Sequence, residues 1–325
     1  MSAEIQSICR NAWYNCVVHG FSRGTDLARK FDTELRVIAK ISPPLIADTR
    51  TTLLESDMEL NTVLRRGMNA PNTIEHKKRL IEMLPDHVKD IGGLSYPKVI
   101  FLETALLLES LRATCGNCSE VLSYFVDPLL KAGDTAGCMI TIANEVLPLF
   151  PGLFIKLLIL QVISIYINKA IAGIHSEFSA AMVAKQLVRI FTKCCHRIEK
   201  VHAVAITCAE RIIGHVPSAL CQKSSLYAML ELLTLMWFSC LDEEIDEYSW
   251  RSTMSSVRGG VTIELSDSYS LRKKILGAFH ANSRKWALHV LQFAPMDVKG
   301  LLQVINSGLL IYCRLISIDL LIGTR

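Results

Sequence analysis

Apolar residues recur at helical spacing along most of the chain, with charged residues between them. The clearest example lies between residues 198 and 213, where apolar side chains return every three or four positions and so share one helix face. These positions are Ile198, Val201, Ala205, Cys208 and Ile212. Gly214 and Pro217 follow, and both residue types end helices. This pattern predicts an amphipathic helix over 198–213.

Similar patterns predict helices along the rest of the sequence. We expect them near residues 3–20, 25–41, 57–69, 73–84, 97–113, 128–131, 135–149, 177–195, 226–240 and 267–292. The segments 97–113 and 226–240 are apolar on nearly every side; from Val99 onward the first carries charge only at Glu103, Glu109 and Arg112. Such helices are typical of positions between two packed neighbours.

One segment has a different pattern. After Gly259-Gly260, the apolar residues Val261, Ile263 and Leu265 alternate with polar ones, as in a β-strand. We expect a short extended segment near 261–265, and no set of strands that could build a sheet. The predicted fold class is therefore all-α. A compact bundle and an α-solenoid both fit, and helices buried on two sides favour the solenoid, with stacked helix pairs of the HEAT or armadillo type.

Composition excludes several classes of protein. Of the 325 residues, 50% are hydrophobic and 20% are charged, which excludes a largely disordered chain. The formal net charge of +4 is too small to indicate nucleic-acid binding, so no nucleic-acid partner is expected. The 11 Cys occur without a secretory signal and mostly within apolar periods. We expect a reducing compartment, with the thiols used as small core residues.

Two unusually apolar stretches account for the high mean hydropathy of +0.32. Leu153–Ile174 is interrupted by lysines, and Val304–Ile322 by Arg314 and Asp319. A membrane-spanning helix needs about 20 predominantly apolar residues, and a charge near its centre costs roughly 2.5–3.5 kcal/mol. Buried helices are therefore the favoured interpretation of both stretches, and membrane spans are the alternative.

Candidate chemistry is sparse in this sequence. Cys115 and Cys118 form an isolated CxxC motif, whereas a structural zinc site requires a second pair of ligands. Cys194-Cys195-His196, with His202, is the other cluster, and core thiols are its favoured interpretation. The sequence contains no phosphate-binding loop, nucleophile elbow or protein-kinase catalytic loop. We therefore predict no catalytic, cofactor-binding or metal-binding residue in this chain.

An acidic run follows the predicted 226–240 helix. It consists of Asp242, Glu243, Glu244, Asp246 and Glu247, and Trp250 comes three residues later. Catalytic carboxylates need opposed placement in a pocket, whereas a run in one loop is typical of a solvated face or a protein-binding patch. Trp is enriched at interface hot spots, so these six residues are the candidate partner contact. A solvated face is nevertheless the favoured interpretation of the run, and the partner contact is the alternative.

A basic stretch lies on the predicted 267–292 helix. It comprises Arg272-Lys273-Lys274 and Arg284-Lys285. Such residues attract anionic lipid headgroups, each contributing about 1 kcal/mol near a membrane surface. A solvated helix face is the more usual meaning of the pattern and is the expectation here.

Several segments together resemble the helical region of the type III alpha phosphatidylinositol 4-kinases, especially the fungal forms. The similarity is strongest in Cys194-Cys-His-Arg-Ile-Glu-Lys-Val201 and continues through Cys208-Ala-Glu-Arg-Ile-Ile213 and Leu230-Glu-Leu-Leu-Thr-Leu-Met-Trp237. His19-Gly-Phe-Ser-Arg-Gly24 and Asp48-Thr-Arg-Thr-Thr-Leu-Leu54 are similar nearer the N-terminus. The resemblance covers roughly residues 1–149 and 176–303, and the common order of the segments argues against coincidence.

The resemblance implies a specific function. These kinases phosphorylate phosphatidylinositol at the 4-position with ATP and a divalent metal, and an extended α-solenoid precedes their C-terminal kinase domain. They act at the plasma membrane with a tetratricopeptide-type scaffold and a lipid-anchored membrane protein. The chain resembles only the solenoid, so no catalytic, ATP-binding or metal-binding residue is carried over to it. The resemblance implies a non-catalytic scaffold segment in phosphoinositide signalling, cytoplasmic and peripheral at the plasma membrane.

The resemblance fails in the two apolar stretches. We therefore divide the chain into a solenoid segment, 1–303, with an insert at about 151–176 unlike the family, and an aberrant apolar tail, 304–325. Translated introns would explain both stretches, because A/T-rich non-coding DNA encodes an excess of Ile, Leu, Lys, Asn and Tyr. Two alternatives to a kinase segment stay open: a stand-alone helical-repeat adaptor for protein interactions, and a small membrane protein anchored by 153–174.

Overall fold

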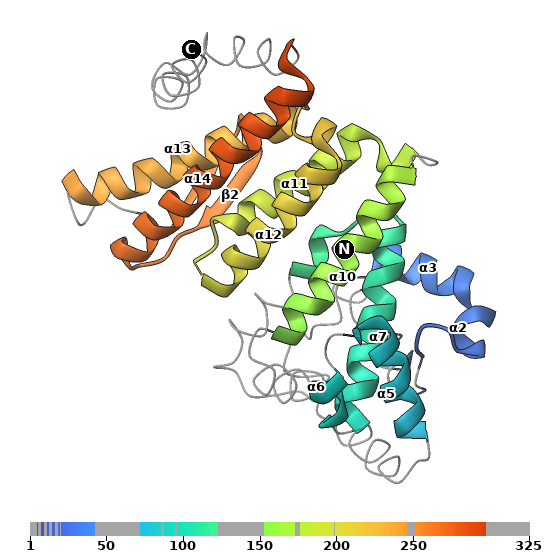
Figure 1. Ribbon diagram of the computed structural model, residues 1–325. Coiled ribbons are helices and arrows are strands. Elements are labelled where there is room, and N and C mark those ends of the chain that lie inside the picture. The colour runs from blue at the N-terminus through green and yellow to red at the C-terminus, as the bar shows by residue number, and fades with distance from the viewer. Residues whose placement is uncertain are drawn as a thin grey trace. The chain divides into compact units, whose positions relative to one another are not determined.

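The structure is a computed structural model of the chain. It describes residues 21–42, 72–85, 88–94, 96–122, 153–172, 176–197, 199–245 and 251–296, with a few single positions before residue 21. The described residues are mostly helical, which confirms the all-α fold class (Figure 1). They belong to two compact units, Met1–Tyr166 and Ile167–Arg325, and each unit is described by itself.

The first unit combines several short helices with the longer helices α7 (Tyr96–Thr114) and α10 (Leu153–Ala172). In chain order these elements are α2 (Asp26–Lys30), α3 (Asp32–Ile41), α5 (Asn72–Met83), α6 (Val88–Gly92), α7, the 3-10 turn η3 (Ser119–Leu122) and most of α10. The long helix α7 packs against α3 and α5, and α5 also contacts α6. The core of this unit therefore forms around α7.

Helix α7 is buried on nearly every side, as its sequence predicts. Its described apolar side chains are buried, and so are its charged residues Glu103, Glu109 and Arg112. Burying a charge is costly unless the charge is paired, and Arg112 Nε lies 3.6 Å from Glu109 Oε2, one turn earlier. The helix ends in a Schellman motif, in which the Asn117 amide donates to the Arg112 carbonyl and Gly116 adopts a φ of 88°.

The helix predicted over 25–41 is in fact two helices, α2 and α3. Phe31 separates them with φ −110° and ψ 25°, and its ring centroid lies 6.4 Å from that of Phe21. The chain is helical again from Asp32, and α3 buries Leu35 and Ala39. The prediction of one continuous helix was wrong because hydrophobic periodicity does not report an aromatic contact made outside the helix.

The second unit contains two helical hairpins that stack on each other (Figure 1). The first hairpin pairs α11 (Ala180–Cys194) with α12 (Glu199–His215), and the second pairs α13 (Lys223–Ile245) with α14 (Tyr269–Phe293). The 3-10 turns η4 (Ser176–Phe178) and η5 (Pro217–Ala219) precede the two hairpins. Because α11 packs on α13 and α12 packs on α14, equivalent helices form two layers, as in one step of a solenoid.

Two ion pairs align α12 with α14. Lys274 donates to Glu199 at 2.5 Å, and Lys285 pairs with Glu210. Both pairs join residues 75 positions apart, so the two helices run in the same direction. The four side chains are about half exposed or more, so each pair contributes only about 0–1 kcal/mol and mainly marks the register of the helices.

The extended segment predicted near 261–265 is confirmed as strand β2 (Val261–Glu264). It pairs in antiparallel register with β1 (Thr253–Ser256), a strand that the sequence did not predict because β1 is short and polar. In β2, Val261 and Ile263 are buried, and the strand contacts α11, while β1 contacts α13. The hairpin therefore packs on the first helices of both stacked pairs.

An aromatic cluster lies in the core of the second unit. Phe191 of α11 stacks on Trp286 of α14, with ring centroids 5.5 Å apart, and Phe279 meets both rings edge-on at 6.1 and 6.2 Å. On α12 the predicted stripe positions Val201, Ala205, Cys208 and Ile212 are fully buried, which confirms its amphipathic character, and Ile198 lies outside the described residues. These contacts join the helices of both hairpins into one core.

Among the described helices, α13 is long and apolar enough to cross a membrane. Core helices pass the same test, and 61% of the most apolar part of α13 is buried within the fold. In α10, Ile159, Val162 and Ile163 are also buried, which favours a core helix for the first apolar stretch. The second stretch, 304–325, and the helices predicted at 57–69, 128–131 and 135–149 lie outside the described residues.

Candidate functional site

The predicted partner contact lies at the C-terminal end of α13. Asp242, Glu243 and Glu244 belong to the last turns of this helix, which continues to Ile245. The expectation that the whole acidic run forms a loop was therefore wrong for these three residues. No Gly or Pro occurs between Cys240 and Gly259, so nothing in the sequence forces the helix to end earlier. Asp246, Glu247 and Trp250 lie outside the described residues.

Two of the acidic residues hold the start of α14. Glu243 forms an ion pair with Arg272, whose side chain is fully buried and also donates a hydrogen bond to the Ser266 carbonyl at 2.5 Å. Glu244 accepts a hydrogen bond from Tyr269 and lies 3.7 Å from Lys273. The pairing means that Glu243 and Glu244 contribute to the α13–α14 contact, whatever else the acidic run binds.

The basic stretch on α14 also differs from its prediction. Lys273 and Lys274 are exposed, as expected for a solvated face, but Arg272 is 0% exposed. Burial lowers the pKa of the Arg272 guanidinium, and the neighbouring Cys240 opposes this effect. The prediction was wrong at Arg272 because a local charge pattern does not show that a neighbouring helix supplies a carboxylate.

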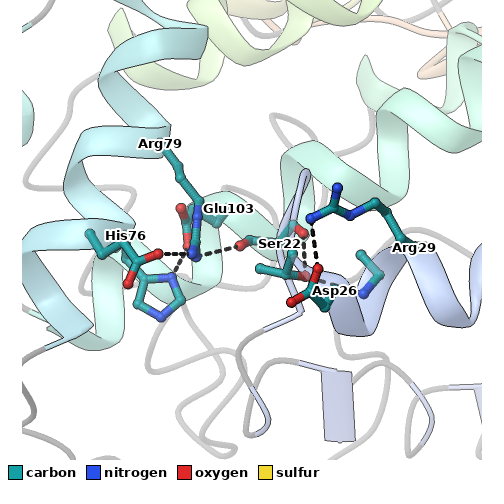
Figure 2. Close-up of polar contacts among 9 residues, drawn as sticks. Ser22, Asp26, Arg29, His76, Arg79 and Glu103 are labelled. Atoms are coloured by element: carbon teal, nitrogen blue, oxygen red, sulfur yellow. Dashed lines mark hydrogen bonds and ion pairs between the residues drawn. The ribbon is translucent and has the colours of Figure 1, made fainter.

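A second polar cluster connects three segments of the first unit. His76 of α5 lies with its Nδ1 2.5 Å from Oε2 of Glu103 on α7, and Arg79, one turn later, pairs with Glu75 and reaches Ser22 Oγ at 3.4 Å (Figure 2). Burial raises the pKa of the Glu103 carboxyl, and the contact with His76 opposes that rise. In the sequence, Glu103 is a charge on an apolar helix, and its partner cannot be identified from the local pattern.

This cluster has the residue types of an acid–base pair without the access that catalysis needs. His76 and Glu103 are 7% and 1% exposed. A general acid or base must come within hydrogen-bond reach of a substrate atom, and both ring and carboxyl lie inside the α5–α7 contact. We therefore interpret the cluster as a structural connection between α5 and α7.

Most described cysteines of the second unit are core residues, as predicted, and Cys221 is half-buried. Cys194, Cys195 and Cys208 are buried and free, and burial raises the pKa of all three thiols, that of Cys208 to about 12. Such thiols are protonated at neutral pH and poorly nucleophilic. In the part of the chain that the structure describes, no three His, Cys, Asp or Glu residues lie close enough to hold a metal ion.

A hollow in the first unit is another place where charged side chains gather around a space. It has a volume of about 410 Å³ and is lined by residues of the segment 23–36, by α7 and by Ile165 of α10. This hollow could not be predicted from the sequence, because its arginines, from the segment 23–36, line it together with residues of α7 only after α3 packs on α7.

Comparison with known proteins finds that the chain is similar to part of two fungal phosphatidylinositol 4-kinases. No family model matches the chain. Phosphatidylinositol 4-kinase STT4 of Saccharomyces cerevisiae is 31% identical over 310 residues, which cover 95% of this chain and 16% of that protein. Phosphatidylinositol 4-kinase stt4 of Schizosaccharomyces pombe is 29% identical over 301 residues, covering 91% of this chain and 15% of that protein.

These matches confirm the resemblance to the fungal type III alpha phosphatidylinositol 4-kinases. The chain spans only about one sixth of the length of these relatives, so it is similar to one segment of them. The division at residue 303, the insert at about 151–176 and the solenoid over the whole of 1–303 stay predictions.

Proposed function

We propose that this chain is a non-catalytic helical scaffold segment of a phosphatidylinositol 4-kinase. The observation that carries the proposal is the similarity of 95% of the chain to one segment of a kinase about six times as long. The stacked hairpins of the second unit support a scaffold role, because such stacks bury a continuous core while presenting long surfaces to partners. The sequence motifs of phosphoryl transfer are absent from the 325 residues.

In this proposal the segment positions a kinase domain that other parts of the protein supply. That domain would bind ATP and a divalent metal and would phosphorylate phosphatidylinositol at the 4-position. The segment would be cytoplasmic and peripheral at the plasma membrane, within a complex containing a tetratricopeptide-type scaffold and a lipid-anchored membrane protein. The acidic run that ends α13, together with Trp250, would contact a basic surface of one of these partners.

Sequencing full-length transcripts tests the parentage of the chain. We expect both apolar stretches to be removed by splicing and the reading frame to continue past Gln303 into a lipid-kinase domain. A transcript that retains both stretches and ends after Arg325 would instead support a stand-alone helical-repeat adaptor. Retention of 153–174 together with resistance of the polypeptide to carbonate extraction would support the membrane-anchored alternative.

Charge reversal tests the partner contact within the full-length kinase. Replacing Asp242, Asp246 and Glu247 by Lys should reduce recruitment to the plasma membrane while leaving kinase activity on detergent-solubilised phosphatidylinositol unchanged. Glu243 is left intact because it pairs with buried Arg272. Glu34→Lys, Glu82→Lys and Glu264→Lys together, three reversals at exposed carboxylates of the described residues, are the charge-matched control. Equal loss of recruitment in the control would mean that net charge, and not this surface, controls localisation.

A further inference from the structure

The hollow in the first unit combines an apolar floor with a basic rim. Leu35, Leu107, Leu111 and Ile165 contribute apolar surface, and its volume of about 410 Å³ lies within the range of small-molecule sites, roughly 300–1,000 Å³. The wall comes from α3 and α7, which pack directly on each other. The space is therefore formed by packed helices of one unit.

Three arginines line this hollow against a single acidic residue. They are Arg23, Arg29 and Arg36, and the acidic residue is Asp32. Arg36 Nε donates to Asp32 at 2.6 Å, and Arg36 Nη1 donates to Thr114 Oγ1 at 3.1 Å. These two hydrogen bonds fix the Arg36 guanidinium at the rim. A guanidinium carries five N–H donors, so these bonds leave donors unused.

The other two guanidinium groups are less neutralised by protein. Arg29 donates to Asp26 at 2.7 Å, and this pair is largely exposed to solvent, so it is weak and easily rearranged. Arg23 forms no hydrogen bond or ion pair with any residue that the structure describes. The lining groups thus carry a net charge of +2, with one cation lacking a described protein partner.

A buried hydroxyl in the same hollow also lacks a partner. Ser110 of α7 lines the space and is 7% exposed, and its Oγ has no hydrogen-bond partner among the described residues. Leaving a buried donor unsatisfied costs about 1–3 kcal/mol. A ligand oxygen in the hollow would satisfy this hydroxyl, whereas the rim arginines alone do not.

We infer that this hollow binds a small amphipathic anion, with a phosphate group at the arginines and an apolar portion on the leucine floor. Arginine matches phosphate oxygens with parallel hydrogen bonds, and its charge is always present near neutral pH. The apolar floor favours a phosphate ester over inorganic phosphate. The same chemistry occurs in soluble organic phosphates and in phospholipid headgroups. The inference does not depend on the proposed scaffold function.

Calorimetric titration of the full chain with phenyl phosphate tests the site. We expect saturable binding, weakened at least tenfold by Arg23→Gln. Lys30→Gln is the matched control, because Lys30 carries the same charge at the end of α2 without lining the hollow. Ser110→Ala should weaken binding several-fold while leaving the urea midpoint unchanged or raised, since it removes an unsatisfied hydroxyl. A merely structural serine would not give this combination.

Two further probes identify the source of the phosphate. Sedimentation with phosphatidic acid vesicles that depends on Arg23 would assign the site to lipid headgroups, and binding of phenyl phosphate without vesicle binding would assign it to soluble esters. Both results support the inference. A dissociation constant for phenyl phosphate weaker than about 10 mM would overturn the inference. Equal losses of affinity in Arg23→Gln and Lys30→Gln, or unchanged affinity in Ser110→Ala, would overturn it as well.

Discussion

The ion pair between Glu243 and Arg272 should be the polar contact on which the α13–α14 hairpin depends most. Removing one partner of a buried pair leaves a charge uncompensated and costs about 3–5 kcal/mol. Arg272 is fully buried, but the Glu243 side chain is 22% exposed and can be partly replaced by water. We therefore expect Glu243→Gln to destabilise the second unit toward the lower limit, by about 3 kcal/mol.

Replacing the other partner of the pair, Arg272, should be less damaging. Arg272→Met removes the buried charge and keeps an unbranched apolar side chain, and it leaves Glu243 able to contact solvent. In the double variant the two costs should not add, because the Arg272 charge that Glu243→Gln would leave unpaired is absent. The pairwise coupling energy in this cycle should fall within about 0.5–3 kcal/mol.

Hydrogen exchange in the full chain measures these effects locally. Peptides from the end of α13 and the start of α14 should exchange roughly 100-fold faster in Glu243→Gln, because each 1.4 kcal/mol of opening free energy is a factor of about ten. Lys285→Gln, which breaks an exposed pair on α14, is the control and should change exchange by less than about fivefold, or 1 kcal/mol. If the two variants exchange alike, Arg272 does not depend on Glu243 and the reasoning fails.

Substitutions at four other positions test the second unit. Phe279→Ala should lower the free energy of unfolding in urea by about 3–5 kcal/mol, because Phe279 is fully buried in the aromatic cluster, and Phe279→Leu should cost clearly less. Burial lowers the pKa of His196 to about 4, so the folded protein binds fewer protons than the unfolded chain between that value and the ordinary 6.5; stability should fall as the pH drops through this window, and His196→Gln should flatten the fall measured by thermal unfolding. Gly259→Ala places a Cβ 2.9 Å from Cβ of Glu231 and should cost about 1–3 kcal/mol in the same urea assay, whereas Gly214→Ala, with open space, should be neutral or stabilising.

Elements with a strong local pattern were predictable from the sequence. The α12 stripe and the alternation in β2 repeat with the period of their structure, and α7 and α13 are long, nearly all-apolar runs of helix formers, so the type of each element was predicted correctly. The similarity to fungal kinases was also visible in the order of short segments. Periodicity, however, identifies an apolar face without identifying the helix that covers it.

Features that depend on distant residues were not predictable. The burial of Arg272 requires Glu243 of the preceding helix, and the position of Glu103 requires His76, 27 residues earlier. A single sequence treats each of these charges as a member of its own local pattern, in which exposed charges are the norm. The rim of the hollow is harder still to predict, because arginines such as Arg23 and Arg36 become neighbours of Ser110 only through helix packing.

The two ion pairs between α12 and α14 have a mechanical consequence. Glu199 and Glu210 on one helix, and Lys274 and Lys285 on the other, are separated by the same eleven residues, about three helical turns. Sliding one helix along the other by a single turn, 5.4 Å, would break both pairs together. Because each pair contributes only about 0–1 kcal/mol, the two pairs add a small resistance to shear along the helix axes. Because these pairs are exposed and salt screens them, this resistance to shear should weaken as ionic strength rises.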